Sequence, residues 1–166
     1  PVLGVLVGAV MTMIFQSSSA TVGLVIALAT TGVVDFPGAA ALVLGDNIGT
    51  TITANLAAIG TNVSAKRVAR AHFIFNFFGV CVMLLIFPYF VQFVDYLTPG
   101  DPMQMAEAGA LPYAARHVAN LHTLFNVTNC MLFLPIMGVL GWVASLITPG
   151  EEKPRVFRLE TLVPTI

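Results

Sequence analysis

The stretch Gln16-Ser17-Ser18-Ser19-Ala20-Thr21 decides how the chain folds, because it interrupts an otherwise apolar segment. No Asp, Glu, Lys or Arg occurs from Pro1 to Val34. A single helix of that length would reach roughly 50 Å, whereas the hydrocarbon core of a bilayer is about 30 Å thick. The polar cluster therefore separates two arms, Val2–Phe15 and Val22–Val34, each of about 20 Å as a helix. This pattern predicts a re-entrant helical hairpin with the serines at its tip.

Non-helical backbone at membrane depth is tolerated only where protein or water surrounds it. The hairpin is therefore expected to pack on other helices of the protein. Gly4 and Gly8 have the GxxxG spacing that lets helix backbones approach closely, and Gly23 is a further small residue on the second arm. These three glycines are the expected contact points.

A second polar interruption follows at Gly45-Asp46-Asn47-Ile48-Gly49-Thr50-Thr51. Phe36-Pro37-Gly38 marks a turn and the start of a helix, and apolar character resumes at Ile52. Short apolar halves around a glycine-rich polar segment are typical of a discontinuous transmembrane helix, and such breaks point to binding sites near the bilayer midplane. We therefore expect a broken helix here.

The composition excludes an ordinary soluble domain. The chain is 57% hydrophobic and 9% charged with a mean hydropathy of +0.90, whereas soluble domains carry about 25% charged residues. A net charge of -1 offers no basic field for nucleic acid. Two conventional spans are predicted, one over Ala71–Val94 with a kink or end near Pro88, and one within His117–Ile147. The expected fold class is an all-α integral membrane protein.

The charged residues predict the topology. Two basic clusters are separated by both spans and so fall on one side, which the positive-inside rule makes cytoplasmic: Lys66, Arg67 and Arg70, and in the tail Lys153, Arg155 and Arg158. The loop Asp95–Arg116 between the spans is mainly acidic and is expected outside. This describes a multi-pass protein of the cell's inner (plasma) membrane.

The hairpin tip has the chemistry of an ion site. A helix that starts there presents unpaired N–H groups and a positive dipole end, so Ser17–Thr21 would form an anion cradle with added hydroxyl donors. Hydroxyl and carbonyl oxygens around unwound helices also suit Na⁺. Asp46 is the only acid in the predicted membrane core and should face an ion, a partner or water. The alternatives are helix packing by the small serines and helix capping by Asn47, Thr50 and Thr51.

A faint repeat places His72 and Asn76 on one span and His122 and Asn126 on the other. Each pair is four residues apart and so shares a helix face. Two interpretations stay open for these four residues: hydrogen bonding between neighbouring helices, or a proton relay or ion site.

Together, the serine motif and the Gly45–Thr51 motif resemble the sodium-dependent phosphate cotransporter family (Na⁺/Pi cotransporters), bacterial branch, and so do the two His–Asn segments. The resemblance implies an elevator-like transporter of two inverted repeats, of which this chain is the second, with inorganic phosphate as cargo and Na⁺ as coupling ion, no other cofactor or metal, and no enzyme activity. Its implied partners are the other repeat, the lipid bilayer and, as an open case, a second copy in a homodimer.

The resemblance also implies roles for residues. The phosphate-binding set is Gln16, Ser17, Ser18, Ser19, Thr50 and Thr51, and the sodium-binding set is Gln16, Ser18, Asn47, Thr50 and Thr51. Asp46 is added to the sodium-binding set because a charge in the membrane core should face a cation. Residue 46 is often Ala in this motif, so Asp46 is a departure. The expected division is 1–60 for half of the transport core, 61–150 for a two-span hairpin, and 151–166 for a cytoplasmic tail leading to a domain resembling the phosphate-uptake regulator PhoU.

Two other functions are alternatives to transport. One is an intramembrane serine hydrolase with a nucleophile among Ser17–Ser19 and His72 or His122 as base, although no G-x-S-x-G elbow surrounds the serines. The other is a non-transporting membrane phosphate sensor or scaffold.

Overall fold

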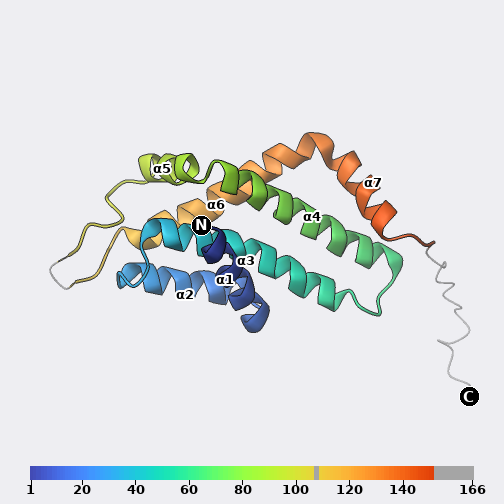
Figure 1. The fold of residues 1–166 in the computed structure, drawn as a ribbon, viewed down its shortest axis with the longest axis horizontal. Helices are drawn as coiled ribbons and strands as arrows, with labels where there is room; N and C mark the ends of the chain where they lie inside the picture. Colours follow the sequence, from blue (N-terminus) through green and yellow to red (C-terminus); the bar gives the residue numbers. More distant parts are fainter. Residues whose placement is uncertain (107–108, 152–166) are drawn as a thin grey trace, which may run out of the picture.

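The computed structural model describes residues 1–106 and 109–151, and this part of the chain is helical throughout, without strands. Figure 1 shows α3 at the centre, with α1 and α2 on one side and α4 on the other. In chain order the helices are α1 (Val2–Phe15), α2 (Ser18–Thr30), α3 (Phe36–Ala57), α4 (Val63–Leu85), α5 (Phe87–Leu97), α6 (Ala114–Phe133), the short 3₁₀ helix η1 (Leu134–Ile136) and α7 (Met137–Ile147).

The central helix α3 contains most of the core. It begins with Asp35 as N-cap, whose carboxylate accepts a hydrogen bond from the Gly38 amide at 2.8 Å, and Pro37 lies in its first turn. Its 22 residues make it about 33 Å long. All residues from Ala39 to Asn47 are buried, because α1, α2, α4 and α6 pack around this helix.

The predicted break at Gly45–Thr51 is wrong, since α3 runs through it without interruption. The glycines serve close packing instead. A Cβ atom on Gly45 would lie 2.0 Å from the Val5 carbonyl oxygen, and one on Gly49 would lie 2.5 Å from the Ala9 carbonyl oxygen, so both glycines let α1 lie directly on α3.

The polar side chains of the same motif are also accommodated without a break. Asn47 donates to the Val43 carbonyl at 2.9 Å, Thr50 to the Asp46 carbonyl at 2.9 Å, and Thr51 to the Ile48 carbonyl at 2.7 Å. Because these hydrogen bonds stay within α3, the polar residues need no unwound backbone.

The two predicted arms of the N-terminal hairpin are present as α1 and α2. The turn between them is shorter than expected, because α2 starts at Ser18 rather than Val22. Gln16 alone turns the chain, with φ 52° and ψ 26°, and Ser17 caps α2 by accepting a hydrogen bond from the Ala20 amide. The residues Ser18–Thr21 therefore form the first turn of a helix.

Gly4 and Gly8 make the close approach that their spacing predicts. A Cβ atom on Gly8 would lie 2.0 Å from the Leu42 carbonyl oxygen, and one on Gly4 would lie 2.7 Å from the Ala41 Cβ. The same prediction for Gly23 is wrong, because a Cβ atom there would meet no described atom within 4 Å. The close contact of the hairpin with α3 thus comes from α1.

Among the described residues, two helical segments are long and apolar enough to cross a membrane, Val63–Leu85 and Ala114–Ile147. The first begins at Val63, eight residues before the predicted start at Ala71, and ends at Leu85, near Pro88 as predicted. The second ends at Ile147, ahead of Pro149-Gly150. Arg67 at the start of α4 donates hydrogen bonds to the Thr148 and Gly150 carbonyls, at 3.1 and 3.0 Å. The first basic cluster and the end of α7 therefore lie at the same end of the molecule. The predicted tail lies outside the described residues from residue 152 onward.

Candidate functional site: a buried carboxylate beneath the hairpin tip

A buried carboxylate lies where α1, α2 and α3 meet. Asp46 of α3 is fully buried, with 0% of its surface exposed. The Thr12 hydroxyl of α1 donates to one carboxylate oxygen at 2.8 Å, and the Ser18 hydroxyl of α2 donates to the other. Thr12 and Thr21 are also hydrogen-bonded to each other, with 3.0 Å between their hydroxyl oxygens. We call Thr12, Ser18, Thr21 and Asp46 the Asp46 cluster.

The sequence explains why these four side chains meet. Thr12 follows Gly4 and Gly8 at intervals of four residues, so it lies on the face of α1 that contacts α3. Ser18 and Thr21 are three residues apart in the first turn of α2 and share a face. The sharp turn at Gln16 brings that face next to the end of α1.

His122 of α6 extends this polar centre. Its imidazole lies close enough to Asp46 for an electrostatic interaction with the carboxylate. His122 also lines a cavity of about 330 Å³ whose other walls include Ser18 and Ser19 and the apolar residues Val22 and Ile26 of α2. The Asp46 cluster therefore lies beside a space bordered by hydroxyls and an imidazole.

The hairpin tip joins the partially negative carbonyl end of α1 to the partially positive amide end of α2. The last carbonyl groups of α1 and the first amide groups of α2 lack partners within their helices. The carbonyl end of a helix favours cations, and the amide end favours anions. The carbonyl end of α1, the amide end of α2 and the Asp46 carboxylate therefore lie near one another.

The predicted site residues fall into three groups. Ser18 and Asp46 are in direct contact, and Thr50 lies one turn from Asp46 on the same face of α3. Gln16 and Ser19 are exposed at the tip, while Ser17 is the cap of α2. The third group, Asn47 and Thr51, is buried and bonds to the backbone of α3.

The two His–Asn pairs lie apart from each other. Asn76 donates to the His72 carbonyl at 3.1 Å and Asn126 to the His122 carbonyl at 2.9 Å, so each amide bonds within its own helix. His72 lines a separate cavity between α3 and α4. Of the four residues, His122 is the one in the polar centre.

Sequence reasoning missed Thr12, and it missed Asn129 as the residue that joins α4 and α6. Asn129 is fully buried and donates to the Phe75 carbonyl at 3.1 Å. A Cβ atom on Gly79 would lie 2.2 Å from the Asn129 side-chain oxygen, so this glycine makes room for the amide. The four-residue register of Gly4, Gly8 and Thr12 was the signal that could have identified the threonine.

The fold and this centre define a helical membrane-type protein in which hydroxyl groups of a helical hairpin meet a buried carboxylate. The family model described as Na+/Pi-cotransporter matches residues 1–94, which include the whole hairpin and α3. The chain belongs to the Na⁺/Pi-cotransporter family, which is a family of transporters and not of enzymes. Membership in this family, together with the apolar helices, indicates a membrane protein.

Relatives carry names that fit this family. The chain is 35% identical over 146 residues to the uncharacterised protein YqeW of Bacillus subtilis, covering 88% of this chain and 43% of YqeW. It is 42% identical over 88 residues to the mouse sodium-dependent phosphate transport protein 2C, covering 51% of this chain and 15% of the mouse protein. It is 29% identical over 151 residues to YjbB of Escherichia coli K12, named provisionally as an inorganic phosphate export protein, covering 91% and 25% of the two chains.

The chain spans less than half the length of these curated relatives. No solved structure matches it.

Proposed function

We propose that this chain forms one half of a transporter that couples the movement of inorganic phosphate across the membrane to Na⁺. The observation that carries the proposal is the Asp46 cluster, in which hydroxyls of both hairpin arms converge on one buried carboxylate. The names of the relatives support phosphate as cargo, and the mouse protein's name supports sodium dependence.

Asp46 provides the charge for the proposed sodium site. An ionised carboxylate is costly to bury, so the ionised form of Asp46 requires a compensating charge. Thr12 and Ser18 supply hydrogen bonds but no positive charge, and His122, which interacts electrostatically with Asp46, donates no hydrogen bond to it among the described residues. A sodium ion would supply that charge, and the hydroxyl oxygens of the cluster and the terminal carbonyls of α1 are hard ligands of the kind it prefers.

The first turn of α2 provides the proposed phosphate site. The backbone N–H groups of Ser18 and Ser19 lie in the first turn of α2 and have no acceptor within that helix. The Ser19 side chain is exposed and lines the same cavity as His122. Neutral N–H and hydroxyl donors bind an anion less tightly than several Lys or Arg side chains would, so the anion can also be released. In this arrangement Gln16 and Thr50 flank the two ions.

The remaining predictions complete the proposal. The hairpin is re-entrant, residues 1–60 and 61–150 form separate parts, and this chain is the second of two inverted repeats, which with the other repeat of the same protein forms an elevator-like transporter in the plasma membrane. The Lys66–Arg70 end of the molecule is cytoplasmic. A PhoU-like domain after the tail and a homodimer belong to the same set of predictions.

The geometry does not favour the hydrolase alternative. In a serine hydrolase the base lies between the nucleophile and the acid. Here the Ser18 hydroxyl donates directly to Asp46, and the described residues show no hydrogen bond between Ser18 and His122. A centre that holds ions accounts for this arrangement, whereas an activated nucleophile does not.

Phosphate flux tests the proposal. The full-length protein is reconstituted in liposomes, and flux of radiolabelled phosphate is compared between a sodium and a potassium gradient. We expect flux with sodium, lowered about tenfold or more by Ser18→Ala, since a hydrogen bond to a charged group contributes about 1.5–3 kcal/mol.

Ser145→Ala is the matched control, because the Ser145 hydroxyl donates to the Gly141 carbonyl of its own helix α7. Absence of sodium-dependent flux in the folded protein would favour the sensor or scaffold. Equal phosphate flux in the Ser18→Ala and Ser145→Ala variants would show that the first turn of α2 is not the phosphate site.

A further inference from the structure

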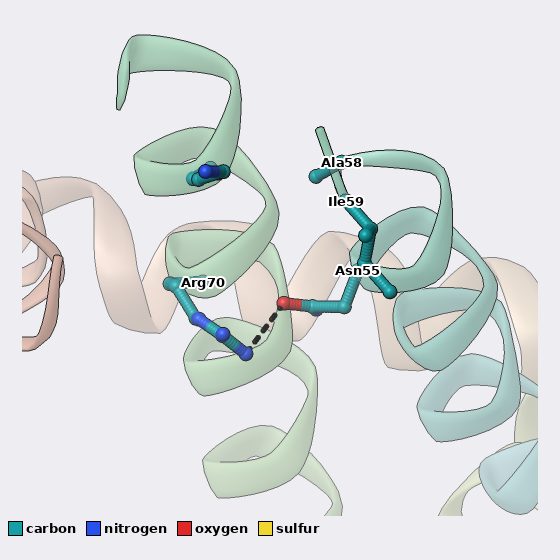
Figure 2. A pocket seen from close by; sticks show the side chains of 5 residues that line it. Asn55, Ala58, Ile59 and Arg70 are labelled. Carbon is teal, nitrogen blue, oxygen red and sulfur yellow. Dashed lines mark hydrogen bonds between the residues drawn. The ribbon is translucent and has the colours of Figure 1, made fainter. Parts of the chain in front are cut away.

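A basic cavity lies outside the Asp46 cluster, at the end of the molecule where α3 is followed by α4. Its volume is about 60 Å³, and Figure 2 shows Arg70 of α4 reaching across to Asn55 of α3. The lining residues are Asn55, Ala58, Ile59, Lys66 and Arg70.

Asn55 fixes the geometry of this cavity. Its side-chain amide group donates to the Thr51 carbonyl at 2.8 Å and to the Ala69 carbonyl of α4 at 2.9 Å. Its oxygen accepts a hydrogen bond from the Arg70 guanidinium at 3.0 Å. Because an arginine has five N–H donors, this bond orients the guanidinium and leaves other donors available for an anion.

The positive charge of the cavity is not neutralised within the described part of the chain. Among residues 1–106 and 109–151, the one contact of salt-bridge length joins His117 and Asp95, 3.1 Å apart at the ends of α6 and α5 near the acidic loop. Lys66 and Arg70 are four residues apart and so face the same side of α4. Two cations at one cavity without a carboxylate partner make it an anion site.

An apolar groove adjoins the basic cavity. Its volume is about 330 Å³, and it shares Asn55, Ile59 and Arg70 with the cavity. The rest of its lining is apolar, and Leu56 and Ile59 have 55% and 73% of their surface exposed. The added lining residues are Ile52, Leu56 and Phe73. A free phosphate ion would make no favourable contact with this apolar groove. A phospholipid can place its phosphate in the cavity and an acyl chain in the groove.

The position along α4 agrees with a lipid. Lys66 and Arg70 lie in the first turns of the candidate span Val63–Leu85, where headgroups meet the hydrocarbon region. Basic pockets between helices on the cytoplasmic side attract anionic headgroups. We propose that this site binds one anionic phospholipid of the cytoplasmic leaflet, with its phosphate between Lys66 and Arg70 and an acyl chain along the groove. The site is independent of the ions carried at the hairpin tip.

The test uses photoreactive lipids on the full-length protein in nanodiscs. Phosphatidylglycerol carrying a diazirine in one acyl chain is compared with the matching phosphatidylcholine, and adducts are located by mass spectrometry. We expect phosphatidylglycerol to label the segments 52–59 and 66–73. Lys66→Gln should lower this labelling about fivefold, the expected effect of one basic residue near a membrane surface.

Arg67→Gln is the matched control, since Arg67 carries the same charge one residue away but bonds to the end of α7 instead of lining the cavity. It should change the labelling by less than about twofold. Thermal unfolding of each variant is measured to check that the protein remains folded.

Three results would overturn the proposal. They are equal labelling by the two lipids, equal loss in the Lys66 and Arg67 variants, and displacement of phosphatidylglycerol by inorganic phosphate at millimolar concentration. The last result would identify free phosphate as the occupant.

Discussion

Gly45→Ala tests whether the second motif is a helix packed closely on α1, as the structure shows, or a flexible break. The new Cβ atom would lie 2.0 Å from the Val5 carbonyl oxygen and 2.8 Å from the Ala9 amide nitrogen. Both atoms belong to the backbone, so no side-chain rotation relieves the clash. Helix α1 would have to move by about 1 Å, because Cβ contacts shorter than 3.0 Å are essentially never observed.

This movement has two costs. Overpacking typically lowers the free energy of unfolding by about 1–3 kcal/mol. The same movement takes Thr12 away from Asp46, whose hydrogen bond is 2.8 Å long, and a bond to a charged group is worth about 1.5–3 kcal/mol. For a chain of this size we expect Tm to fall by about 2–4 °C per kcal/mol, and phosphate flux to fall with it.

Gly23→Ala is the matched control, because its Cβ atom would meet no described atom within 4 Å. Replacing a helical glycine with alanine should raise stability there by about 0.5–1 kcal/mol. Thermal unfolding in detergent measures both variants. If Gly45→Ala unfolds at the same or a higher temperature than the parent, as Gly23→Ala should, the close contact between α1 and α3 is refuted.

Three further predictions follow from the hairpin turn, the contact between α4 and α6, and the topology. Gln16→Gly should raise Tm, because the left-handed backbone conformation at this position costs a non-glycine residue about 1–2 kcal/mol. The same substitution should slow phosphate flux, and a lower Tm would contradict the strained turn. Asn129→Ala should destabilise the protein by about 1 kcal/mol or more in thermal unfolding, because it removes the hydrogen bond between α6 and α4. Asn126→Ala should destabilise it less, because the Asn126 hydrogen bond stays within α6. The reverse order of the two variants would be inconsistent with the structure. A cysteine at Ser64 should resist an impermeant thiol reagent in intact cells while one at Gln104 reacts, and the opposite pattern would invert the topology.

The hairpin could be predicted from sequence because its signal is local. The charge-free run from Pro1 to Val34 is too long for one helix across the hydrocarbon core, so the polar cluster within it marks where the helix breaks. The first arm ends at Phe15, as the cluster indicates. The start of α2 was misplaced by four residues because serines at a helix start serve equally as cap and first turn, as Ser17 and Ser18 do.

The second motif could not be interpreted from its own residues. Glycine both weakens a helix and lets another helix approach, and only the position of the partner helix decides between these effects. At Gly45 and Gly49 the partner is α1, whose Val5 and Ala9 carbonyls contact them. That contact lies about forty residues away in sequence, so no local pattern could reveal it.

The candidate site was partly predictable for the same reason. Ser18 and Asp46 were identified by residue type, since a hydroxyl at a hairpin tip and an acid in a membrane core are unusual. Thr12 was missed because a single threonine on an apolar arm carries no such signal. Its role depends on the α1–α3 register that the glycines set.

The sodium dependence of phosphate flux in Asp46→Asn tests the central claim, that the buried carboxylate compensates a bound sodium ion. The amide keeps the shape of the side chain, its oxygen can accept from Thr12, and its nitrogen can donate to Ser18, so the fold should persist. Removing one unit charge at about 4 Å from the ion weakens the attraction by up to about 4 kcal/mol at an effective dielectric constant of about 20.

We therefore expect the half-saturating sodium concentration to rise at least about tenfold, with a smaller change in phosphate affinity at saturating sodium. Asp101→Asn, an exposed acid in the loop before α6, should leave both values unchanged. An unaltered sodium dependence in a well-folded Asp46→Asn protein would contradict the account.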